Sequence, residues 1–171
     1  MCGIVAYIGS KDPLPIILEG LKRLEYRGYD SSGVAIAKEN SVKVFKQKGK
    51  VQDLIDFTKD KDVNSNLAIG HTRWATHGGV TEDNAHPHVS NNKIAVVHNG
   101  IIENHEEQCS RLKKLGYKFE SETDTEVIAH LIHYYYIKKN NLLKATNLAT
   151  KDLVGAYAIA VIAVDNKEEL I

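Results

Sequence analysis

The residue in this chain best suited to chemistry is Cys2, which directly follows the initiator Met1. Cysteine is small enough for the methionine to be removed, and its removal leaves a thiol and a free α-amine on one residue. An α-amino group has a pKa of about 7.7–8.0, so at neutral pH it can accept the proton of the thiol. The thiolate is the reactive form. The sequence therefore predicts an N-terminal nucleophile or, alternatively, a small apolar residue that opens a buried strand.

A polar segment at residues 71–79 is typical of a binding loop rather than of a core. Arg73 offers a planar fork that can bind a carboxylate through two parallel hydrogen bonds. Trp74 can form a rigid wall, and the glycine pair at 78–79 lets a ligand approach the backbone. The alternatives are a solvated arginine and a tryptophan that belongs to the core. Residues 25–33 form a similar mixed loop, for which a solvated turn is the alternative.

The third segment is the sequence His98-Asn99-Gly100, directly after an apolar stretch that ends at Val97. The Asn99 amide and the Gly100 N–H can both donate to a developing oxyanion, and one such donor is worth about 2.7–4 kcal/mol in the transition state. A tight Asn-Gly turn is the alternative. Asp124 lies at a predicted helix start, where it favours the helix dipole or pairs with a substrate ammonium.

The eight histidines raise the question of a metal site. The nearest approaches to ligand spacing are the pair His86 and His88 and the pair His130 and His133, and neither fits a known zinc pattern. There is no HExxH, no CxxC pair, and no glycine-rich phosphate loop followed by lysine. We therefore expect no metal and no cofactor.

Composition favours one globular domain that spans residues 1–171, with 43% hydrophobic and 26% charged residues. Lys+Arg and Asp+Glu are both 22, so the basic excess of nucleic-acid-binding proteins is absent. The apolar run at 3–8 is too short for a signal peptide or a membrane span, which predicts a cytoplasmic protein that binds neither nucleic acid nor membrane. The two cysteines argue against a disulfide framework, and Cys109 is expected to be an inert helix residue.

The elements that must position these residues read as one layered α/β unit. Short β-branched runs predict strands at 3–8, 34–37, 42–45, 67–70, 94–97 and 156–164. Amphipathic runs predict helices at 14–24, 51–60, 104–115, 124–139 and 142–152. Thr123 with Glu126 three residues later predicts a capping box at the fourth helix. Because strands and helices do not alternate one for one, layered sheets covered by helices are favoured over a doubly wound sheet.

Several long motifs together resemble one known family, the glutaminase domains of glucosamine-6-phosphate synthases. The resemblance runs nearly end to end. The motif that contains Trp74 separates this family from the related glutamine phosphoribosylpyrophosphate amidotransferases and asparagine synthetases. The motifs are MCGIV at 1–5, RLEYRGYDS at 23–31, HTRWATHG at 71–78, NAHPH at 84–88, VHNGIIEN at 97–104 and SETDTE at 121–126.

The resemblance implies an α+β N-terminal-nucleophile hydrolase fold, a four-layer αββα sandwich, and hydrolysis of glutamine through a γ-glutamyl thioester. By motif position, Cys2 would be the nucleophile with Asn99 and Gly100 as the oxyanion hole. Arg73 and Asp124 would hold the α-carboxylate and α-ammonium of glutamine. The remaining implied residues are Arg27 and Gly28, which would support the nucleophile, and Trp74, Thr76, His77 and His86, which would shape the pocket.

Departures from the family pattern are few. Ala6 and Val80 stand where the family usually has glycine and proline, and both changes look tolerable. Family members continue beyond the point matching Ile171 with more glutaminase sequence and two sugar-isomerase domains. We therefore expect an incomplete glutaminase domain whose last strand has an unpaired edge. Its ammonia would be used by a sugar-isomerase domain or subunit. The alternatives are an inactive fragment and a module that binds glutamine or docks onto a separate isomerase.

Overall fold

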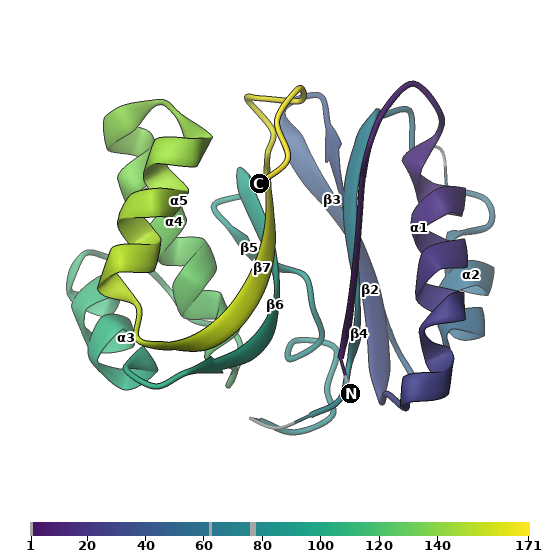
Figure 1. Ribbon diagram of the computed structural model, residues 1–171, viewed down its shortest axis with the longest axis horizontal. Coiled ribbons are helices and arrows are strands. Elements are labelled where there is room, and N and C mark those ends of the chain that lie inside the picture. The colour runs from purple at the N-terminus through teal and green to yellow at the C-terminus, as the bar shows by residue number, and fades with distance from the viewer. Residues whose placement is uncertain (1, 62, 76–77) are drawn as a thin grey trace.

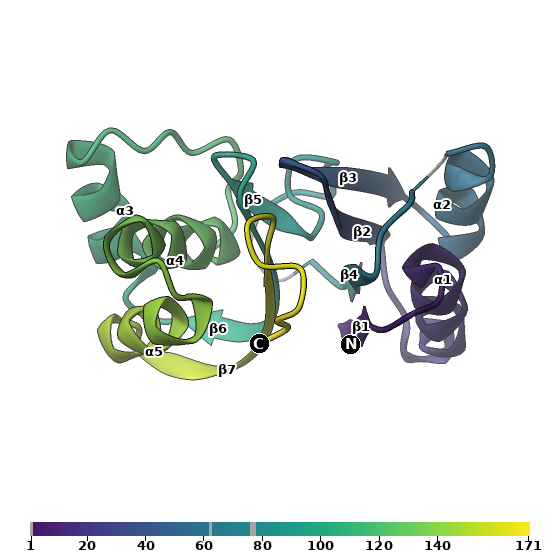
Figure 2. The same ribbon diagram turned by 90° about the horizontal axis from the view of Figure 1, so that it is seen from above.

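The computed structural model describes residues 2–61, 63–75 and 78–171. Two antiparallel sheets lie face to face, and each is covered on its outer side by helices, so the chain forms four layers in the order helix, sheet, sheet, helix (Figures 1 and 2). This arrangement confirms the layered architecture predicted from the sequence.

The first sheet has the order β1-β4-β2-β3. Its strands are β1 (Gly3–Ile8), β2 (Ser31–Lys38), β3 (Ser41–Lys48) and β4 (Leu67–Arg73). Two helices, α1 (Pro13–Arg23) and α2 (Val51–Thr58), cover its outer face. β2 and β4 are buried almost throughout because each has a strand on both sides and layers on both faces, which explains their continuous apolar runs.

Helix α1 shows why these residues adopt this structure. Asp12 caps the helix by accepting a hydrogen bond from the N–H of Leu14, and Pro13 occupies the first turn, where no intrahelical N–H bond is lost. Ile17 and Leu21, one helical turn apart, are fully buried against the sheet. A short 3-10 helix, Glu25–Arg27, then leads into β2.

The second sheet has the order β5-β6-β7, with β5 (His88–Ser90), β6 (Ile94–Ile102) and β7 (Gly155–Ala163). Its outer face is covered by α3 (His105–Lys114), α4 (Thr125–Lys139) and α5 (Leu142–Asp152). Nine consecutive residues at the start of α4, 125–133, are buried, so the helix is enclosed on most sides. Cys109 lies in α3, as predicted, and is half-buried.

The two sheets meet through an apolar core of small and β-branched side chains. Its buried members on the first sheet include Ala35 and Ile69, and those on the second include Val97 and Ile162. Separate apolar clusters join each sheet to its own helices. The inter-sheet layer ends near the N-terminus, where polar side chains replace apolar ones, and this change marks the candidate site.

The predicted elements exist, but several predicted boundaries are wrong. His98, Asn99 and Gly100 were expected in a loop, yet they lie inside β6 and pair with Ile159, Ala158 and Tyr157. The start of the second polar loop, residues 71–73, belongs to β4, and Ser31–Gly33 belong to β2. In each case the polar residues are held by ladder hydrogen bonds to a neighbouring strand, which local composition does not reveal. The short strand β5 was not predicted.

The predicted capping box at α4 is also wrong. Asp124 occupies the N-cap position, and Glu126 accepts hydrogen bonds from the N–H groups of Glu120 and Ser121 instead of turning back to Thr123. Thr123 lies 3.0 Å through its Oγ1 from Nε2 of His88. Thr123 and Glu126 therefore form hydrogen bonds with other residues instead of the two reciprocal bonds of a capping box.

Strand β7 has β6 on one side, and on its other side it has only isolated partners among the described residues. Ile171 exchanges two backbone hydrogen bonds with Val161, at 2.8 and 3.2 Å, and Asn166 forms a bridge with Ala163. Ala156 and Ala158 near the start of the strand are exposed. In the described ranges, no helix is long and apolar enough to cross a membrane.

Candidate active site beside the start of the chain

Four separate segments converge where the chain begins. Cys2 immediately precedes β1, Arg73 ends the neighbouring strand β4, Asn99 and Gly100 lie in β6 of the facing sheet, and Asp124 caps α4. β1 and β4 are paired, with Gly3 opposite Thr72, so the register brings the cysteine beside the end of β4. In Figure 1 the first residues of β1 lie at the lower end of the first sheet.

The thiol of Cys2 is free, half-buried and held by the backbone of Trp74. The N–H of Trp74 donates to Sγ at 3.2 Å, and Sγ lies 3.6 Å from the carbonyl oxygen of the same residue. Trp74 is 52% exposed, so it does not belong to the core. Gly28 packs against the Trp74 ring: its φ is +74°, and an added Cβ would lie 2.7 Å from a ring carbon.

Asn99 and Gly100 face the cysteine from the second sheet. The Asn99 Nδ2 lies 3.5 Å from the carbonyl oxygen of Cys2, and its Oδ1 lies 2.8 Å from Nε2 of His71. Gly100 has φ of +127°, and a Cβ there would lie 2.3 Å from the carbonyl oxygen of Ala156. Only glycine suits this position, because both the backbone conformation and the contact exclude a side chain.

Arg73 is 3% exposed and has its guanidinium turned toward backbone carbonyls. It donates to the carbonyl oxygens of Gly79 at 3.1 Å and Gly78 at 3.4 Å, and it lies 3.9 Å from the Asp30 carboxylate. Asp30 also accepts a hydrogen bond from the N–H of Ala75. The arginine is thus already oriented by neutral and anionic oxygens, which is the environment that a buried guanidinium needs.

Two residues that the sequence analysis did not select hold the glycine pair beside Arg73. The Glu122 carboxylate accepts from the N–H of Gly79 at 3.1 Å and from Nδ2 of Asn84 at 3.0 Å. Oδ1 of Asn84 in turn accepts from the N–H of Glu122 at 2.8 Å. The hydrogen bond from Gly79, followed by that from Asn84, lowers the pKa of Glu122. Both residues lie within the quoted motifs, but their types alone indicate only polar loop residues.

Asp124 is 5% exposed. Its Oδ2 accepts a hydrogen bond from the N–H of Ile102 at 2.8 Å, and its Oδ1 lies 3.9 Å from Nδ1 of His98. One oxygen is therefore used to attach α4 to β6, and the other is directed toward the polar cluster. A buried carboxylate of this kind suits a cationic ligand group.

Most of the residues predicted from the sequence line one small cavity of about 30 Å³. Its lining comprises Cys2, Arg73, Trp74, His86, His98, Gly100, Thr123, Asp124 and Thr125. A space of this size admits a water-sized group, so a bound amino acid must displace side chains. Asn99, Gly28 and Arg27 are not among the lining residues, and Arg27 ends the 3-10 helix just before Gly28. Thr76 and His77 lie outside the described residues.

Two buried histidines, His86 and His98, line the cavity, and a third, His71, packs behind them. The rings of His71 and His86 stack with their centroids 4.2 Å apart. Oγ1 of Thr125 lies 2.8 Å from both His86 Nε2 and His98 Nδ1. Burial lowers the pKa of His71 to about 4 and places that of His86 well below its usual range, so both rings are neutral at pH 7. No role was expected from the sequence for His71, His98 or Thr125, although all three stand in the quoted motifs.

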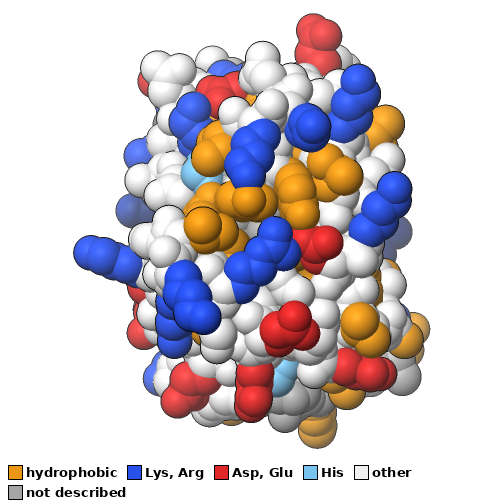
Figure 3. Space-filling view, turned by 90° about the vertical axis from the view of Figure 1, so that its left-hand side faces the viewer, with side chains coloured by type: hydrophobic (Ala, Val, Ile, Leu, Met, Phe, Trp, Pro, Cys, Tyr) orange, Lys and Arg blue, Asp and Glu red, His pale blue; other side chains and the backbone are white. Residues whose placement is uncertain are grey.

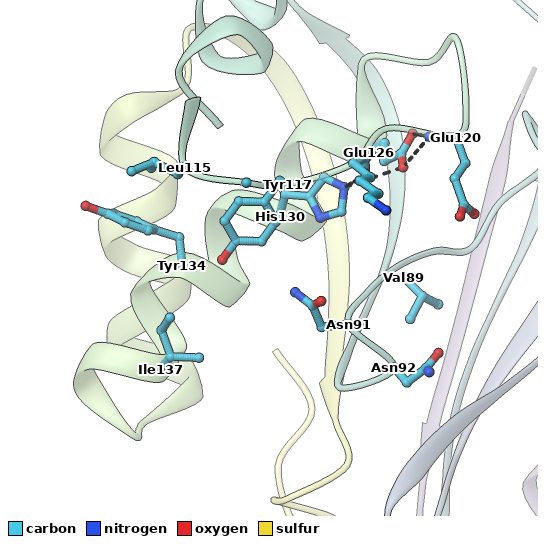
Figure 4. Close-up of a pocket in the computed structure, with 12 residues that line it drawn as sticks. Val89, Asn91, Asn92, Leu115, Tyr117, Glu120, Glu126, His130, Tyr134 and Ile137 are labelled. Atoms are coloured by element: carbon cyan, nitrogen blue, oxygen red, sulfur yellow. Dashed lines mark hydrogen bonds and ion pairs between the residues drawn. The ribbon is translucent and has the colours of Figure 1, made fainter. Parts of the chain in front are cut away.

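A much larger hollow, with a volume of about 740 Å³, lies elsewhere, on the outer side of α4 (Figure 4). Two of its titratable residues, Glu126 and His130, already have hydrogen-bond partners. Glu126 accepts hydrogen bonds from Glu120 and Ser121, and His130 Nε2 lies 2.9 Å from the Lys118 carbonyl oxygen. No cysteine lines it. Figure 3 shows hydrophobic side chains framed by lysine and arginine on this helical side of the molecule.

No group of three or more His, Cys, Asp or Glu side chains within the described part of the chain is placed to hold a metal ion. The ring nitrogens of the clustered histidines instead form hydrogen bonds with the Thr125 and Thr123 hydroxyls and with main-chain and side-chain oxygens.

Comparison with known proteins agrees with this geometry. Residues 71–171 match the glutamine amidotransferase domain family. The glutamine--fructose-6-phosphate aminotransferase (isomerizing) of Xylella fastidiosa is 53% identical over 171 residues, which are 100% of this chain and 28% of that protein. The enzyme of the same name from Neisseria meningitidis is 54% identical over 173 residues, with 100% and 28% covered. The chain thus spans 28% of the length of these relatives.

Solved structures give the same answer for the fold. The glutamine phosphoribosylpyrophosphate amidotransferase of B. subtilis superposes with a TM-score of 0.76 at 27% identity, covering 94% of this chain and 35% of that chain. A structure described as the allosteric regulatory enzyme of purine biosynthesis has a TM-score of 0.77 at 28% identity, covering 96% and 36%. These matches confirm the N-terminal-nucleophile hydrolase fold, and the chain belongs to the glutamine amidotransferase family.

Proposed function

We propose that this chain hydrolyses glutamine to glutamate and ammonia with Cys2 as the nucleophile. The observation that supports this most strongly is the convergence on one cavity of a free thiol, Gly100, and two buried groups of opposite charge, Arg73 and Asp124. A glutamine molecule has a matching set of groups: a carboxylate, an ammonium and a side-chain amide.

The reaction proceeds in two stages. Once Met1 is removed, the α-amine of Cys2 takes the thiol proton, and Sγ attacks the carboxamide carbon of glutamine. The tetrahedral intermediate collapses as the C–N bond breaks, and the amine returns the proton to the leaving nitrogen, which departs as ammonia. Water, deprotonated by the same amine, then attacks the thioester and releases glutamate and the thiol.

Asn99 and Gly100 stabilise the oxyanion in this proposal. The side-chain Nδ2 of Asn99 already faces the Cys2 backbone, and Gly100 is held in β6 next to it. Donors fixed before the reaction lower the barrier because they need no reorganisation when the negative charge forms.

Arg73 binds the α-carboxylate and Asp124 the α-ammonium. Both are buried, so each charge gains strongly from an opposite charge on the ligand. The substrate carboxylate would compete with the Gly78 and Gly79 carbonyls for the guanidinium. Trp74 and His86 are assigned to the pocket walls, as are Thr76 and His77 on the basis of their motif alone. Gly28 and Arg27 are assigned to the support of the nucleophile, Gly28 through its contact with the Trp74 ring.

The use of the ammonia is a further part of the proposal. The two relatives described above are named for aminating fructose 6-phosphate, and the acceptor sugar would be handled by a sugar-isomerase domain or subunit. We therefore assign residues 1–171 to the ammonia-supplying glutaminase part of such an enzyme. The cytoplasmic location and the absence of nucleic-acid and membrane partners stay predictions from the sequence.

The test measures glutamate release by the purified chain after intact-mass analysis has shown removal of Met1. We expect glutamine-dependent glutamate and ammonia in equal amounts, and no glucosamine 6-phosphate when fructose 6-phosphate is added. Glutamine binding without hydrolysis would favour a binding module, and a non-cooperative melt without binding would favour an inactive fragment. Hydrolysis by a chain that retains Met1 would contradict the amine as base.

A further inference from the structure

We propose that His71 is a positioning residue that fixes the orientation of the Asn99 side-chain amide, so that its NH₂ end faces Cys2. This inference rests on the proposed glutaminase function for its kinetic consequence, whereas the hydrogen bond itself does not depend on that function. His71 does not line the cavity and would act only through Asn99.

The atoms around His71 determine which way the amide points. Its Nε2 lies 3.0 Å from the carbonyl oxygen of His98 and 2.8 Å from Oδ1 of Asn99. A backbone carbonyl can only accept, so Nε2 must carry the proton. A protonated nitrogen in turn requires an acceptor from Asn99, so the oxygen of the amide faces His71 and the nitrogen faces the opposite way, toward Cys2.

The other ring nitrogen is consistent with this tautomer. Nδ1 of His71 is buried and has no hydrogen-bond partner among the described residues. In the Nε2–H tautomer this atom is a bare lone pair, whereas the opposite tautomer would bury an unpaired N–H and would also oppose a lone pair to two oxygens. Burial keeps the ring neutral, with a pKa of about 4.

The ring of His71 is itself immobilised. It lies in β4, which pairs on both sides, with His71 opposite Ile4 of β1 and Gly33 of β2. Its face stacks on the ring of His86 at 4.2 Å. His71 therefore connects the sheet that begins at Cys2 with the facing strand that holds the oxyanion donors.

Among the described residues, the second hydrogen bond of the Asn99 side chain is weaker than the one to His71. Its Nδ2 lies 3.5 Å from the Cys2 carbonyl, a distance at which a hydrogen bond is weak. Without His71 the amide can rotate by 180° and present its oxygen to the developing oxyanion. That orientation would repel the transition state while leaving the groups that bind the ends of glutamine unchanged.

The kinetic test compares His71→Leu with His71→Gln. Leucine removes the donor, while the glutamine Nε2 can place an N–H near the position of the imidazole Nε2. We expect His71→Leu to lower kcat about tenfold or more with KM within about twofold, and His71→Gln to recover most of the loss. His133→Leu, which removes a buried histidine on the outer side of α4, is the matched control and should leave both constants within about twofold.

A double-mutant cycle then asks whether His71 acts through Asn99. His71→Leu should have little further effect in an Asn99→Ala background, because no amide remains to be oriented. Multiplicative losses in kcat, a change mainly in KM, or failure of His71→Gln to recover activity would overturn the proposal.

The orientation of the hydrogen bond is tested on the wild-type chain by ¹⁵N NMR of its histidine rings, with each ring assigned by through-bond correlation to its own backbone. We expect the Nε2–H tautomer for His71 at pH 7, and finding the Nδ1–H tautomer would overturn the proposal even if the variants fail to fold. A wild-type chain with the Nε2–H tautomer but no glutaminase activity would contradict the proposed function and leave the hydrogen bond supported.

Discussion

Two polar clusters lie on opposite sides of the first turn of α4, and they differ in what their groups are free to do. Thr125 points into the cluster near Cys2, where it contacts His86 and His98. The next residue, Glu126, belongs to the 740 Å³ hollow on the outer side, where main-chain N–H groups and the Ser121 hydroxyl already satisfy it. The smaller cavity has the thiol and the opposite charges. Volume is thus a poor guide to chemistry in this fold, and the convergence of reactive and charged groups is a better one.

The largest contrast is expected at the two cysteines. Cys2→Ala should reduce glutamine hydrolysis below detection, because no other thiol lines the cavity. Cys109→Ala, in α3 on the outer side, should retain turnover within about twofold. Steady-state glutamate release by both variants checks this. Loss of activity in Cys109→Ala with a normal melt, or activity in Cys2→Ala, would contradict the assignment of Cys2 as the nucleophile and of Cys109 as a residue without a catalytic role.

A smaller but still large effect is expected at Asn99. Asn99→Ala should lower kcat by roughly 10²–10³-fold with little change in KM, because the amide matters most once the oxyanion forms. The control is Asn91→Gly, which changes an asparagine lining the outer hollow at a residue with φ of +50°, a conformation that glycine accepts. If the two variants turn over glutamine equally, the oxyanion assignment is wrong.

Variants of the two charged residues that are assigned to substrate binding should bind glutamine more weakly but turn it over at a similar rate. Arg73→Lys should raise KM about tenfold although the charge is kept, since an ammonium lacks the planar fork for a carboxylate. Asp124→Asn should act similarly at the ammonium end. Arg111→Lys, which alters a half-buried ion pair with Asp152 at 2.8 Å far from the cavity lining, is the control and should leave KM unchanged. Normal KM in both site variants would contradict the assignment of the charged groups.

A change at Glu126, on the outer side of α4, should affect the stability of the fold and not catalysis. Burial alone would raise the pKa of Glu126, but hydrogen bonds from His130 and the N–H groups of Glu120 and Ser121 outweigh it and lower the pKa to about 2. The folded pKa is below the ordinary 4.5, so the stabilisation is present above pH 4.5 and is lost as the pH falls toward 2. Glu126→Gln should cost about 1–3 kcal/mol at pH 7.

Urea unfolding of wild type and Glu126→Gln at pH 7 and at pH 3 measures this effect. The difference between the two chains should shrink at the lower pH, while kcat at pH 7 stays within about twofold. A difference that does not depend on pH, or a large change in kcat, would show that the two sides of α4 are not separable.

Much of the chemistry could be read from the chain itself, because it depends on residue types and on motifs that are contiguous in sequence. The position of Cys2, the motifs around Arg73, Asn99 and Asp124, and the order of helices and strands are of this kind, since amphipathic periodicity and β-branched runs are local properties. The family and its fold are confirmed by the comparisons. The assigned roles of the site residues stay predictions.

Only the tertiary structure determines the contacts between residues that are far apart in the chain. The sequence placed Asn99 in a loop, yet pairing with β7 puts it in a strand, where its amide meets a histidine 28 residues earlier. The predicted Thr123–Glu126 capping box does not form. Glu126 instead accepts hydrogen bonds from the N–H groups of Glu120 and Ser121, and the Thr123 hydroxyl is hydrogen-bonded to His88. Hydrogen bonds of this kind depend on strand register and on how the two sheets face each other, and no local pattern of residue types encodes either.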